Sequence, residues 1–242
     1  MGMGFTVRLR DKAARAGEIL IYEDIGAGGW FSDGVSAKSF TEALKALGDV
    51  ATLDVRINSY GGDVFDGLTI YQQLVQSKAK VTTHIDGIAA SIASVIAMAG
   101  QEIRIAEAGW LMIHDAWGMV AGNAKQLREM ADRMDAVSKQ LAGIYSARTK
   151  KKDEDIVNWM AQEKWFDSKE AVANGFATSV SENLRMAAHA APPGHFRHVP
   201  NVLARKNESP TYNADVRAEL ARTRDDLERR RRTRTLMSRG VG

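Results

Sequence analysis

At residues 87–94 the chain reads Gly-Ile-Ala-Ala-Ser-Ile-Ala-Ser. This stretch follows a strand-like run at residues 80–86 and leads into an apolar segment at residues 92–99. Ser91 is therefore expected where a strand turns into a buried helix. The first backbone N–H groups of a helix have no partner within it and favour negative charge. Two interpretations follow for Ser91: a nucleophile for acyl transfer, or an N-cap residue of a core helix. This stretch alone leaves both open.

The composition is that of a globular protein. Of its 242 residues, 45% are hydrophobic and 26% are charged, and the sequence contains no cysteine. We expect one large domain of about 180 residues with appendages. Without cysteine no disulfide forms, so nothing indicates an oxidising compartment. The formal net charge of +3 is small, so composition alone does not indicate nucleic-acid binding.

From its residue pattern we expect neither a membrane span nor an export signal. Residues 1–20 contain basic side chains but no apolar core of signal-peptide length. The longest apolar run, at residues 85–99, is interrupted by polar residues and is too short to span a bilayer. We therefore expect a soluble, cytoplasmic protein with no membrane partner.

Strand and helix patterns alternate along the first half of the chain. Strand periodicity occurs at residues 17–23, 52–58, 80–86, 102–106 and 110–114. A helix begins near the N-cap Ser36 and ends at Gly48, and a second pattern covers residues 64–77. This alternation predicts βαβ units and a largely parallel sheet with helices on its faces, that is, an α/β fold.

Helical patterns dominate the next part of the chain. Residues 123–148 form a long, charged, amphipathic pattern whose apolar residues recur three or four apart: Leu127, Met130, Met134, Val137, Leu141 and Ile144. Further helices are predicted at residues 153–162 and 168–174, the latter ending at Gly175. Residues 176–180 are predicted to form a closing strand.

We divide the chain into an N-terminal segment (1–16), a main domain (17–184), a linker containing Pro and His (185–214) and a basic, charged tail, helical or disordered (215–242). The linker contains His189, His195 and His198, but a metal site needs converging ligands, so we favour a linker over a metal site. The tail includes the arginine run at residues 229–232. No aromatic residues interleave with it, so we favour a solvated tail over a nucleic-acid contact.

A serine nucleophile needs a base and donors for the oxyanion. His84 lies in the middle of a predicted strand, and we interpret it as structural. His114 ends a predicted strand, where functional side chains gather in α/β proteins, so it is the better candidate base. Adjacent glycines in the turn at residues 58–63, Asn-Ser-Tyr-Gly-Gly-Asp, could aim backbone amides at an oxyanion. An ordinary turn explains that spacing equally well.

Four stretches together resemble the ClpP family of serine peptidases. They are residues 58–64 (Asn-Ser-Tyr-Gly-Gly-Asp-Val), 87–91 (Gly-Ile-Ala-Ala-Ser), 111–114 (Leu-Met-Ile-His) and 170–175 (Glu-Ala-Val-Ala-Asn-Gly). Their order and approximate spacing match the family, and the likeness covers about residues 17–180. The run at residues 92–100 and the Trp-Phe pair at residues 165–166 are most similar to the phage and prophage branch, the ClpP-like head maturation (prohead) proteases.

The resemblance implies specific roles in a peptidase site. It assigns Ser91 as the nucleophile and His114 as the general base and then acid. It assigns the backbone amides of Gly62 and Ile92 as the oxyanion donors. It implies no cofactor and no metal.

The carboxylate departs from the pattern of the family. The family normally has Asp as its third triad member. Counting back from Glu170 in the matching stretch places Glu163 at that position, with Asp167 as the rival. Glu is one methylene longer, but related hydrolases use it to orient a histidine. Tyr60 also departs from the family, which usually has proline there, although both glycines remain.

The resemblance also implies an architecture and partners. The fold would be the ClpP/crotonase-like one, built from repeated β-β-α and βαβ units, with residues 123–148 as a protruding handle helix. Such chains form homo-oligomeric rings, heptameric or double, that enclose a chamber. The implied substrate is a polypeptide, and the implied partners are an AAA+ unfoldase or phage capsid and scaffold proteins.

Three functions remain open on the sequence. The first is a serine endopeptidase that acts through an acyl-enzyme. The second is a crotonase-like acyl-CoA enzyme, because that related fold also uses glycine-turn amides as an oxyanion hole. It does not require both Ser91 and His114, and the long helix fits it less well. The third is a non-catalytic assembly module, against which the retained serine, histidine and carboxylate argue.

Overall fold

We describe a computed structural model of the chain at residues 5–11, 13–26, 34–181, 195–201 and 203. The chain divides into two units, Met1–Pro200 and Asn201–Gly242. Everything below concerns the first unit, and the predicted tail at residues 215–242 lies outside the described residues. Among the described residues, no helix has the length and apolar character needed to cross a membrane.

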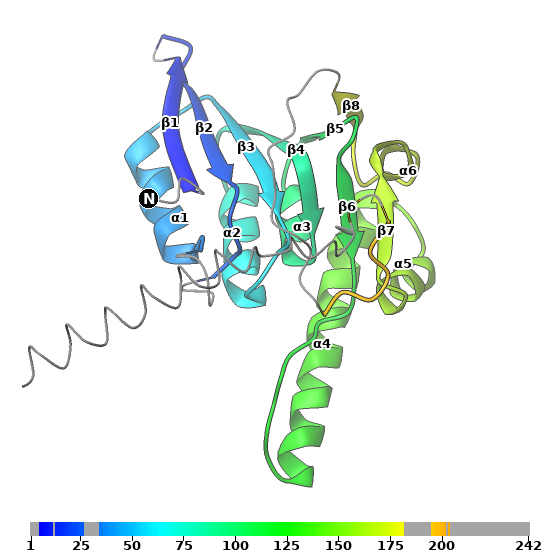
Figure 1. Cartoon of the computed structure of the whole chain (residues 1–242). Coiled ribbons are helices and arrows are strands. Elements are labelled where there is room, and N and C mark those ends of the chain that lie inside the picture. The colour runs from blue at the N-terminus through cyan, green and yellow to red at the C-terminus, as the bar shows by residue number, and fades with distance from the viewer. Residues whose placement is uncertain (1–4, 12, 27–33, 182–194, 202, 204–242) are drawn as a thin grey trace, which may run out of the picture. The chain divides into compact units, whose positions relative to one another are not determined.

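One mixed sheet forms the centre of the unit (Figure 1). Within the described residues its strands are β1 (Phe5–Asp11), β2 (Ala16–Ile21), β3 (Thr52–Ser59), β4 (Lys80–Ala90), β5 (Glu102–Ala106), β6 (Trp110–Ile113), β7 (Lys164–Asp167) and β8 (Ser179–Ser181). The main order is β1-β2-β3-β4-β5-β8, and β6 pairs with both β4 and β7. All pairs from β2 to β8 along this order are parallel. The predicted, largely parallel α/β sheet is confirmed.

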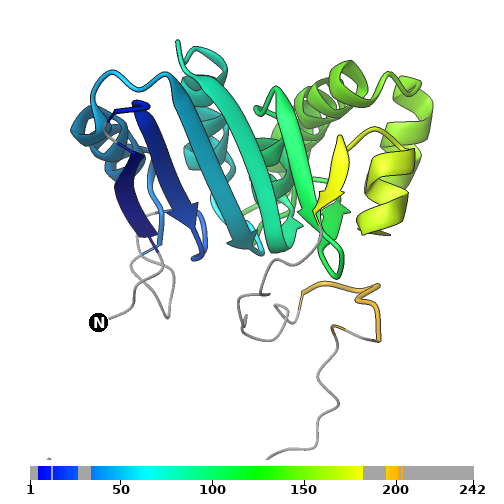
Figure 2. The same cartoon turned by 90° about the horizontal axis from the view of Figure 1, so that it is seen from above.

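The helices follow the predicted positions closely. They are α1 (Ala37–Leu47), α2 (Val64–Val75), α3 (Ile92–Ala97), α4 (Ala124–Thr149), α5 (Asp153–Ala161) and α6 (Ser168–Ala173). Ser36 caps α1, as predicted, by accepting a hydrogen bond from the Ser39 amide. In the view from above, α1 and α2 lie side by side behind the sheet (Figure 2). The sheet is therefore covered by these helices on one face.

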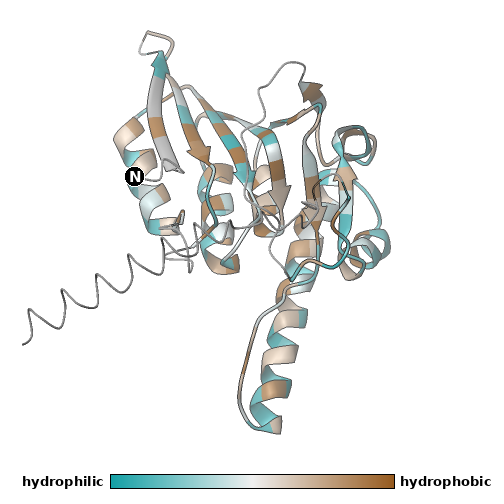
Figure 3. Ribbon diagram, viewed as in Figure 1, coloured by the Kyte–Doolittle hydropathy of each residue, from teal (hydrophilic) through white to brown (hydrophobic). Residues whose placement is uncertain are grey.

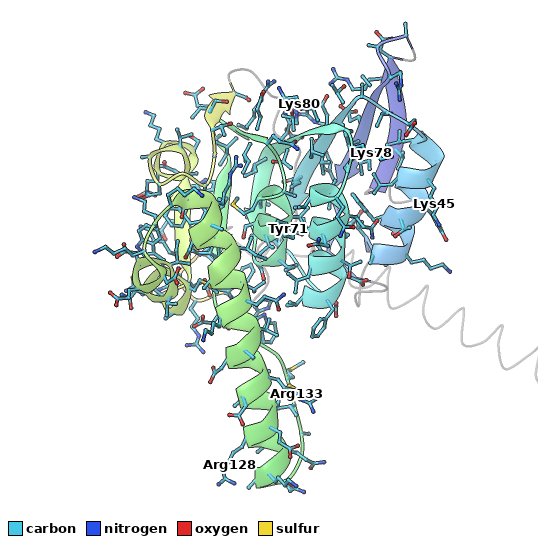
Figure 4. The ribbon with its side chains drawn as sticks, turned by 180° about the vertical axis from the view of Figure 1, so that it is seen from behind. Lys45, Tyr71, Lys78, Lys80, Arg128 and Arg133 are labelled. Carbon is cyan, nitrogen blue, oxygen red and sulfur yellow. The ribbon has the colours of Figure 1, made fainter. Side chains whose placement is uncertain are left out.

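Helix α4 is only partly covered by the rest of the unit. Its first turns extend away from the sheet (Figure 1), and apolar and polar residues alternate along it (Figure 3). Arg128 and Arg133 are exposed on this outer part (Figure 4). On the predicted apolar stripe, Leu127 is 42% exposed whereas Leu141 is buried. The stripe thus continues beyond the part that packs against the sheet.

Two strands were not predicted, and one predicted strand is displaced. Strand β1 was not predicted; it pairs antiparallel with β2 and lies within the segment that the sequence analysis sets apart as residues 1–16. Strand β7 was not predicted either; it pairs antiparallel with β6. The closing strand is Ser179–Ser181, because Phe176 instead inserts its ring into the core. Helix α3, which follows Ser91, ends at Ala97, within the apolar segment at residues 92–99.

Strand β4 carries the chain into the candidate site. Its first half pairs with β5 through residues 82–85, and its last residues pair with β6 through residues 88–90. On its other side it pairs with β3, with a register shift before the Ser59–Ala89 pair. The ends of β3, β4 and β6 therefore meet at one place, as the carboxyl ends of parallel strands do in α/β proteins.

Polar groups within β4 are paired by the neighbouring strands. The Arg56 guanidinium and the Tyr22 hydroxyl both donate to the buried Asp86 carboxylate. Burial and the hydrogen bond to Asp86 raise the pKa of Tyr22 to about 12. His84 Nε2 lies 2.8 Å from an Asp54 oxygen. These contacts give His84 a partner within the sheet, away from the strand ends, in line with its interpretation as structural.

Candidate active site

Ser91 occupies a strained turn between β4 and α3. Its backbone has φ 54 and ψ −132, a conformation that residues other than glycine rarely adopt. The Ser91 amide donates to the Met112 carbonyl at 3.0 Å, which ties the turn to β6. Ser91 stands at the N-cap position of α3, but among the described residues its side chain makes no capping hydrogen bond. The Ser91 side chain therefore does not cap the helix.

The Ser91 hydroxyl instead contacts His114. The distance from Ser91 Oγ to His114 Nε2 is 2.7 Å. Burial lowers the pKa of His114 from 6.5 to about 4, although the nearby Glu163 carboxylate opposes this shift. His114 is thus neutral at pH 7, and its Nε2 can accept the Ser91 hydroxyl proton. Such a pair can carry out acyl-transfer chemistry.

The predicted glycine turn lies directly beside Ser91. Gly61 and Gly62 have φ values of +100 and +140, in the region that favours glycine. A Cβ on Gly61 would lie 2.7 Å from the Ser91 Cβ, and one on Gly62 would lie 2.1 Å from the Ile25 carbonyl oxygen. Both positions therefore require glycine for packing as well as for conformation.

Two backbone amides near Ser91 are outside the local hydrogen-bond ladders. The bridge between Ile25 and Gly62 uses the Gly61 carbonyl and the Asp63 amide, so it does not use the Gly62 amide. Ile92 is the first residue of α3, where amides have no partner within the helix. The two residues assigned as oxyanion donors line one small cavity together with Ser91.

A buried pair that no sequence pattern indicated supports the Ser91 turn. The Ser94 hydroxyl donates to the Ser91 carbonyl at 2.6 Å, and the Tyr145 hydroxyl lies 2.7 Å from Ser94 Oγ. Because the Ser94 proton is used on Ser91, Tyr145 donates to Ser94. Both side chains are fully buried, and burial raises the pKa of Tyr145 well above its usual value. Helix α4 is thereby linked to the backbone of the candidate nucleophile through Ser94.

Glu163 lies near His114 but bonds elsewhere. Both residues line one cavity of about 480 Å³. Within the described residues, the hydrogen bonds of the Glu163 carboxylate come from Trp165 Nε1, the Arg197 amide and the His198 amide. Its backbone is also strained, with φ 51. The structure therefore brings Glu163 to the site without a direct hydrogen bond to His114.

The rival carboxylate, Asp167, has a different task. It is the N-cap of α6 and accepts a hydrogen bond from the Glu170 amide at 2.8 Å. The Glu170 side chain reaches back to the Asp167 amide, which completes a capping box. Asp167 is thus engaged at a helix terminus.

Residues 195–198 also contact the site, which the sequence analysis did not anticipate because it assigns them to the linker. The buried Phe196 ring packs edge-on against the His114 ring, with ring centres 5.8 Å apart. His195 stacks on Trp117 at 4.1 Å. The one available signal was an aromatic residue within a stretch rich in Pro and His.

No metal centre is found among the described residues, where no group of three or more His, Asp or Glu side chains converges. His195 and His198 are described, whereas His189 lies outside the described residues. A cavity of about 730 Å³ opens beside Ser91, and its lining includes Tyr60, Phe65 and Trp117.

The fold and the Ser91–His114 pair define a class: an α/β protein whose strand ends hold a site suited to acyl transfer. Comparison with known families identifies the particular family within this class. Residues 19–184 match the family described as Clp protease. Because this match covers more than half of the chain, the chain belongs to the Clp protease family.

Curated relatives support a protease. The chain is 28% identical over 139 residues to ATP-dependent Clp protease proteolytic subunit 1 of Salinibacter ruber, covering 57% of this chain and 60% of the relative. It is 30% identical over 135 residues to the proteolytic subunit of Porphyromonas gingivalis, covering 55% and 61%. It is 30% identical over 145 residues to the proteolytic subunit of Streptococcus mutans, covering 58% of this chain and 74% of the relative. The chain thus spans less than two thirds of the first two relatives.

Proposed function

We propose that the chain is a serine endopeptidase with Ser91 as nucleophile and His114 as general base. The observation that carries this proposal is the 2.7 Å contact between Ser91 Oγ and the neutral His114 Nε2, made from a strained turn at a helix N-terminus. Strained serines at strand-to-helix turns are typical of hydrolase nucleophiles. Membership of the Clp protease family supports the same reaction.

Glu163 is proposed as the carboxylate that orients His114. It shares a cavity with His114, and its charge favours the protonated form of the imidazole. That imidazolium forms when His114 takes the Ser91 proton, so a nearby carboxylate stabilises the step. The capping role of Asp167 supports Glu163 over this rival.

The proposed reaction proceeds through an acyl-enzyme. Ser91 Oγ attacks the carbonyl carbon of the peptide bond while His114 Nε2 takes the hydroxyl proton. The amides of Gly62 and Ile92 donate to the resulting oxyanion. His114 then gives its proton to the leaving nitrogen, and the C–N bond breaks. Water, activated by His114, attacks the acyl carbon in turn, which releases the second product and restores the Ser91 hydroxyl.

We further propose that copies of this chain assemble into a ring, heptameric or double, that encloses the site. The apolar stripe of α4 supports this, because Leu127 on its outer part remains 42% exposed and Met119, just before the helix, is 91% exposed. A partly uncovered apolar stripe is suited to packing against another copy, and closed homo-oligomers are the common outcome.

The proposed substrate is a polypeptide, and the proposed location is the cytoplasm. The names of the relatives describe ATP-dependent proteases, so we propose an AAA+ ATPase partner that supplies unfolded chains. The second candidate substrate is a phage capsid or scaffold protein. It is favoured by the run at residues 92–100 and the Trp165–Phe166 pair, which resemble the prohead proteases.

Peptide hydrolysis by purified variants tests the proposal. Ser91→Ala should abolish turnover of an unstructured polypeptide, and His114→Ala should leave only the residual rate of about 10³–10⁴-fold over water that triad deletions leave. The matched control is Ser179→Ala, at an exposed serine in β8, which should retain full activity. Hydrolysis that persists in Ser91→Ala would contradict the assignment.

A further inference from the structure

The candidate site already holds a peptide segment of its own chain. Residues 195–198 read His-Phe-Arg-His and lie beside His114 and Glu163 (orange in Figure 1). The Arg197 amide donates to both Glu163 oxygens, at 2.8 and 3.0 Å, and the His198 amide donates to Oε1 at 2.9 Å. These are backbone contacts to a carboxylate, so they do not depend on which side chains follow Phe196.

The side chain of Phe196 supplies an anchor. It is 8% exposed and packs among three rings. Its centre lies 5.8 Å from the rings of His114 and Trp165, both edge-on, and 6.1 Å from that of Tyr60. Edge-to-face packing at these distances is favourable for aromatic pairs. A smaller side chain would leave part of this space unfilled.

The segment also borders the route to the serine. His195 lines the cavity that opens beside Ser91 and the cavity shared by His114 and Glu163. A polypeptide that reaches Ser91 along these cavities meets this segment.

We propose that the rings of Tyr60, Trp165 and His114 form a subsite for an aromatic side chain of a peptide. Glu163 accepts hydrogen bonds from the backbone amides of the two residues that follow the aromatic one. Residues 195–198 bind in this subsite as an intramolecular ligand. The ligand class is a peptide with an aromatic residue followed by two residues with free amide N–H groups. The inhibitory part of this inference rests on the proposed function, because it assigns Glu163 to orient His114.

Occupation of the subsite reduces the number of Glu163 lone pairs that can accept a hydrogen bond from His114. An ionised carboxylate oxygen has about two lone-pair positions. Glu163 Oε1 already accepts from Trp165, Arg197 and His198, and Oε2 accepts from Arg197. Release of the segment frees the carboxylate for the imidazole and uncovers the His114 ring. The segment therefore inhibits, and its removal activates.

The first test uses two substitutions at Arg197 in the full chain. Arg197→Pro removes the amide N–H that binds Glu163, whereas Arg197→Ala keeps it. We expect a fluorophosphonate to label Ser91 about tenfold faster in Arg197→Pro, the factor that loss of one hydrogen bond to a charged group produces. Arg197→Ala should label more slowly than Arg197→Pro, because it keeps the amide. Phe196→Ala should also label faster. Slower or unchanged labelling in both Arg197→Pro and Phe196→Ala would overturn the inhibitory role.

The second test measures binding without catalysis. In the full chain with Ser91→Ala and Phe196→Ala, the blocked peptide His-Phe-Arg-His should bind at least about tenfold more tightly than His-Ala-Arg-His in an NMR titration up to millimolar peptide. Millimolar affinity suffices for a tethered ligand. Equal binding of the two peptides, or no binding of either, overturns the subsite. If the Phe peptide binds but Ser91 is never labelled in any variant, the proposed function fails and the subsite stands.

Discussion

Labelling of Ser91 by a fluorophosphonate is predicted to persist at low pH. The reaction requires neutral His114, because only the neutral imidazole accepts the Ser91 proton. Burial lowers the pKa of His114 from 6.5 to about 4. The labelling rate should therefore rise with pH through the region near pH 4 and be constant above it, instead of rising near pH 6.5.

The size of the effect follows from the titration of one group. At pH 5 a histidine with a pKa of about 4 is about 90% neutral, whereas one with the ordinary pKa is about 3% neutral. The labelling rate at pH 5 should thus lie within about twofold of the rate at pH 7. An exposed base would instead give a fall of about 25-fold over the same interval.

The assay is the rate of adduct formation between pH 4 and pH 8, followed by intact mass, with circular dichroism to check that the protein stays folded. Phe196→Ala is the informative comparison, because it uncovers the His114 ring and should move the half-maximal rate toward pH 6.5. A half-maximal rate near pH 6.5 in the wild-type protein would refute the claim that a buried, neutral His114 is the base.

Three further predictions concern neighbouring residues. Glu163→Gln should lower peptide hydrolysis by about 100-fold or more, whereas Asp167→Asn should have little effect because Asn caps a helix equally well; the reverse ranking would show that the alignment is wrong here. Ser94→Ala should lower the free energy of unfolding in urea by about 1–3 kcal/mol, because it leaves the buried Tyr145 hydroxyl without its acceptor; an unchanged unfolding midpoint would contradict this. Gly61→Ala should abolish labelling, since its Cβ would lie 2.7 Å from that of the candidate nucleophile; labelling at the wild-type rate would contradict the described turn.

The sequence predicted the parts of the site that depend on local pattern. Ser91 and His114 each follow a strand with clear periodicity, and parallel strand ends meet at one edge, so their proximity could be inferred. The glycine pair was similarly visible after β3. The sequence left two interpretations of Ser91, helix cap and nucleophile, and the observed contact with His114 favours the nucleophile.

Other features depend on contacts that a local pattern does not encode. Phe196 is buried only because distant segments place Tyr60, His114 and Trp165 around it, so its stretch was interpreted as linker. The Ser94–Tyr145 pair joins two helices that are far apart in the sequence. Strand β7 is four residues long and is recognisable only through its pairing with β6. Strand β1 was assigned to the N-terminal segment, although its apolar residues 5, 7 and 9 alternate with polar ones.

The most direct measurement of the central claim is the site of covalent modification. Wild-type protein is treated with a fluorophosphonate and digested with a protease, and the adduct is located by tandem mass spectrometry. The account predicts one modified residue, Ser91, and no adduct at that site in His114→Ala within the same reaction time. Modification at another serine, or equal labelling of Ser91 without His114, would contradict it.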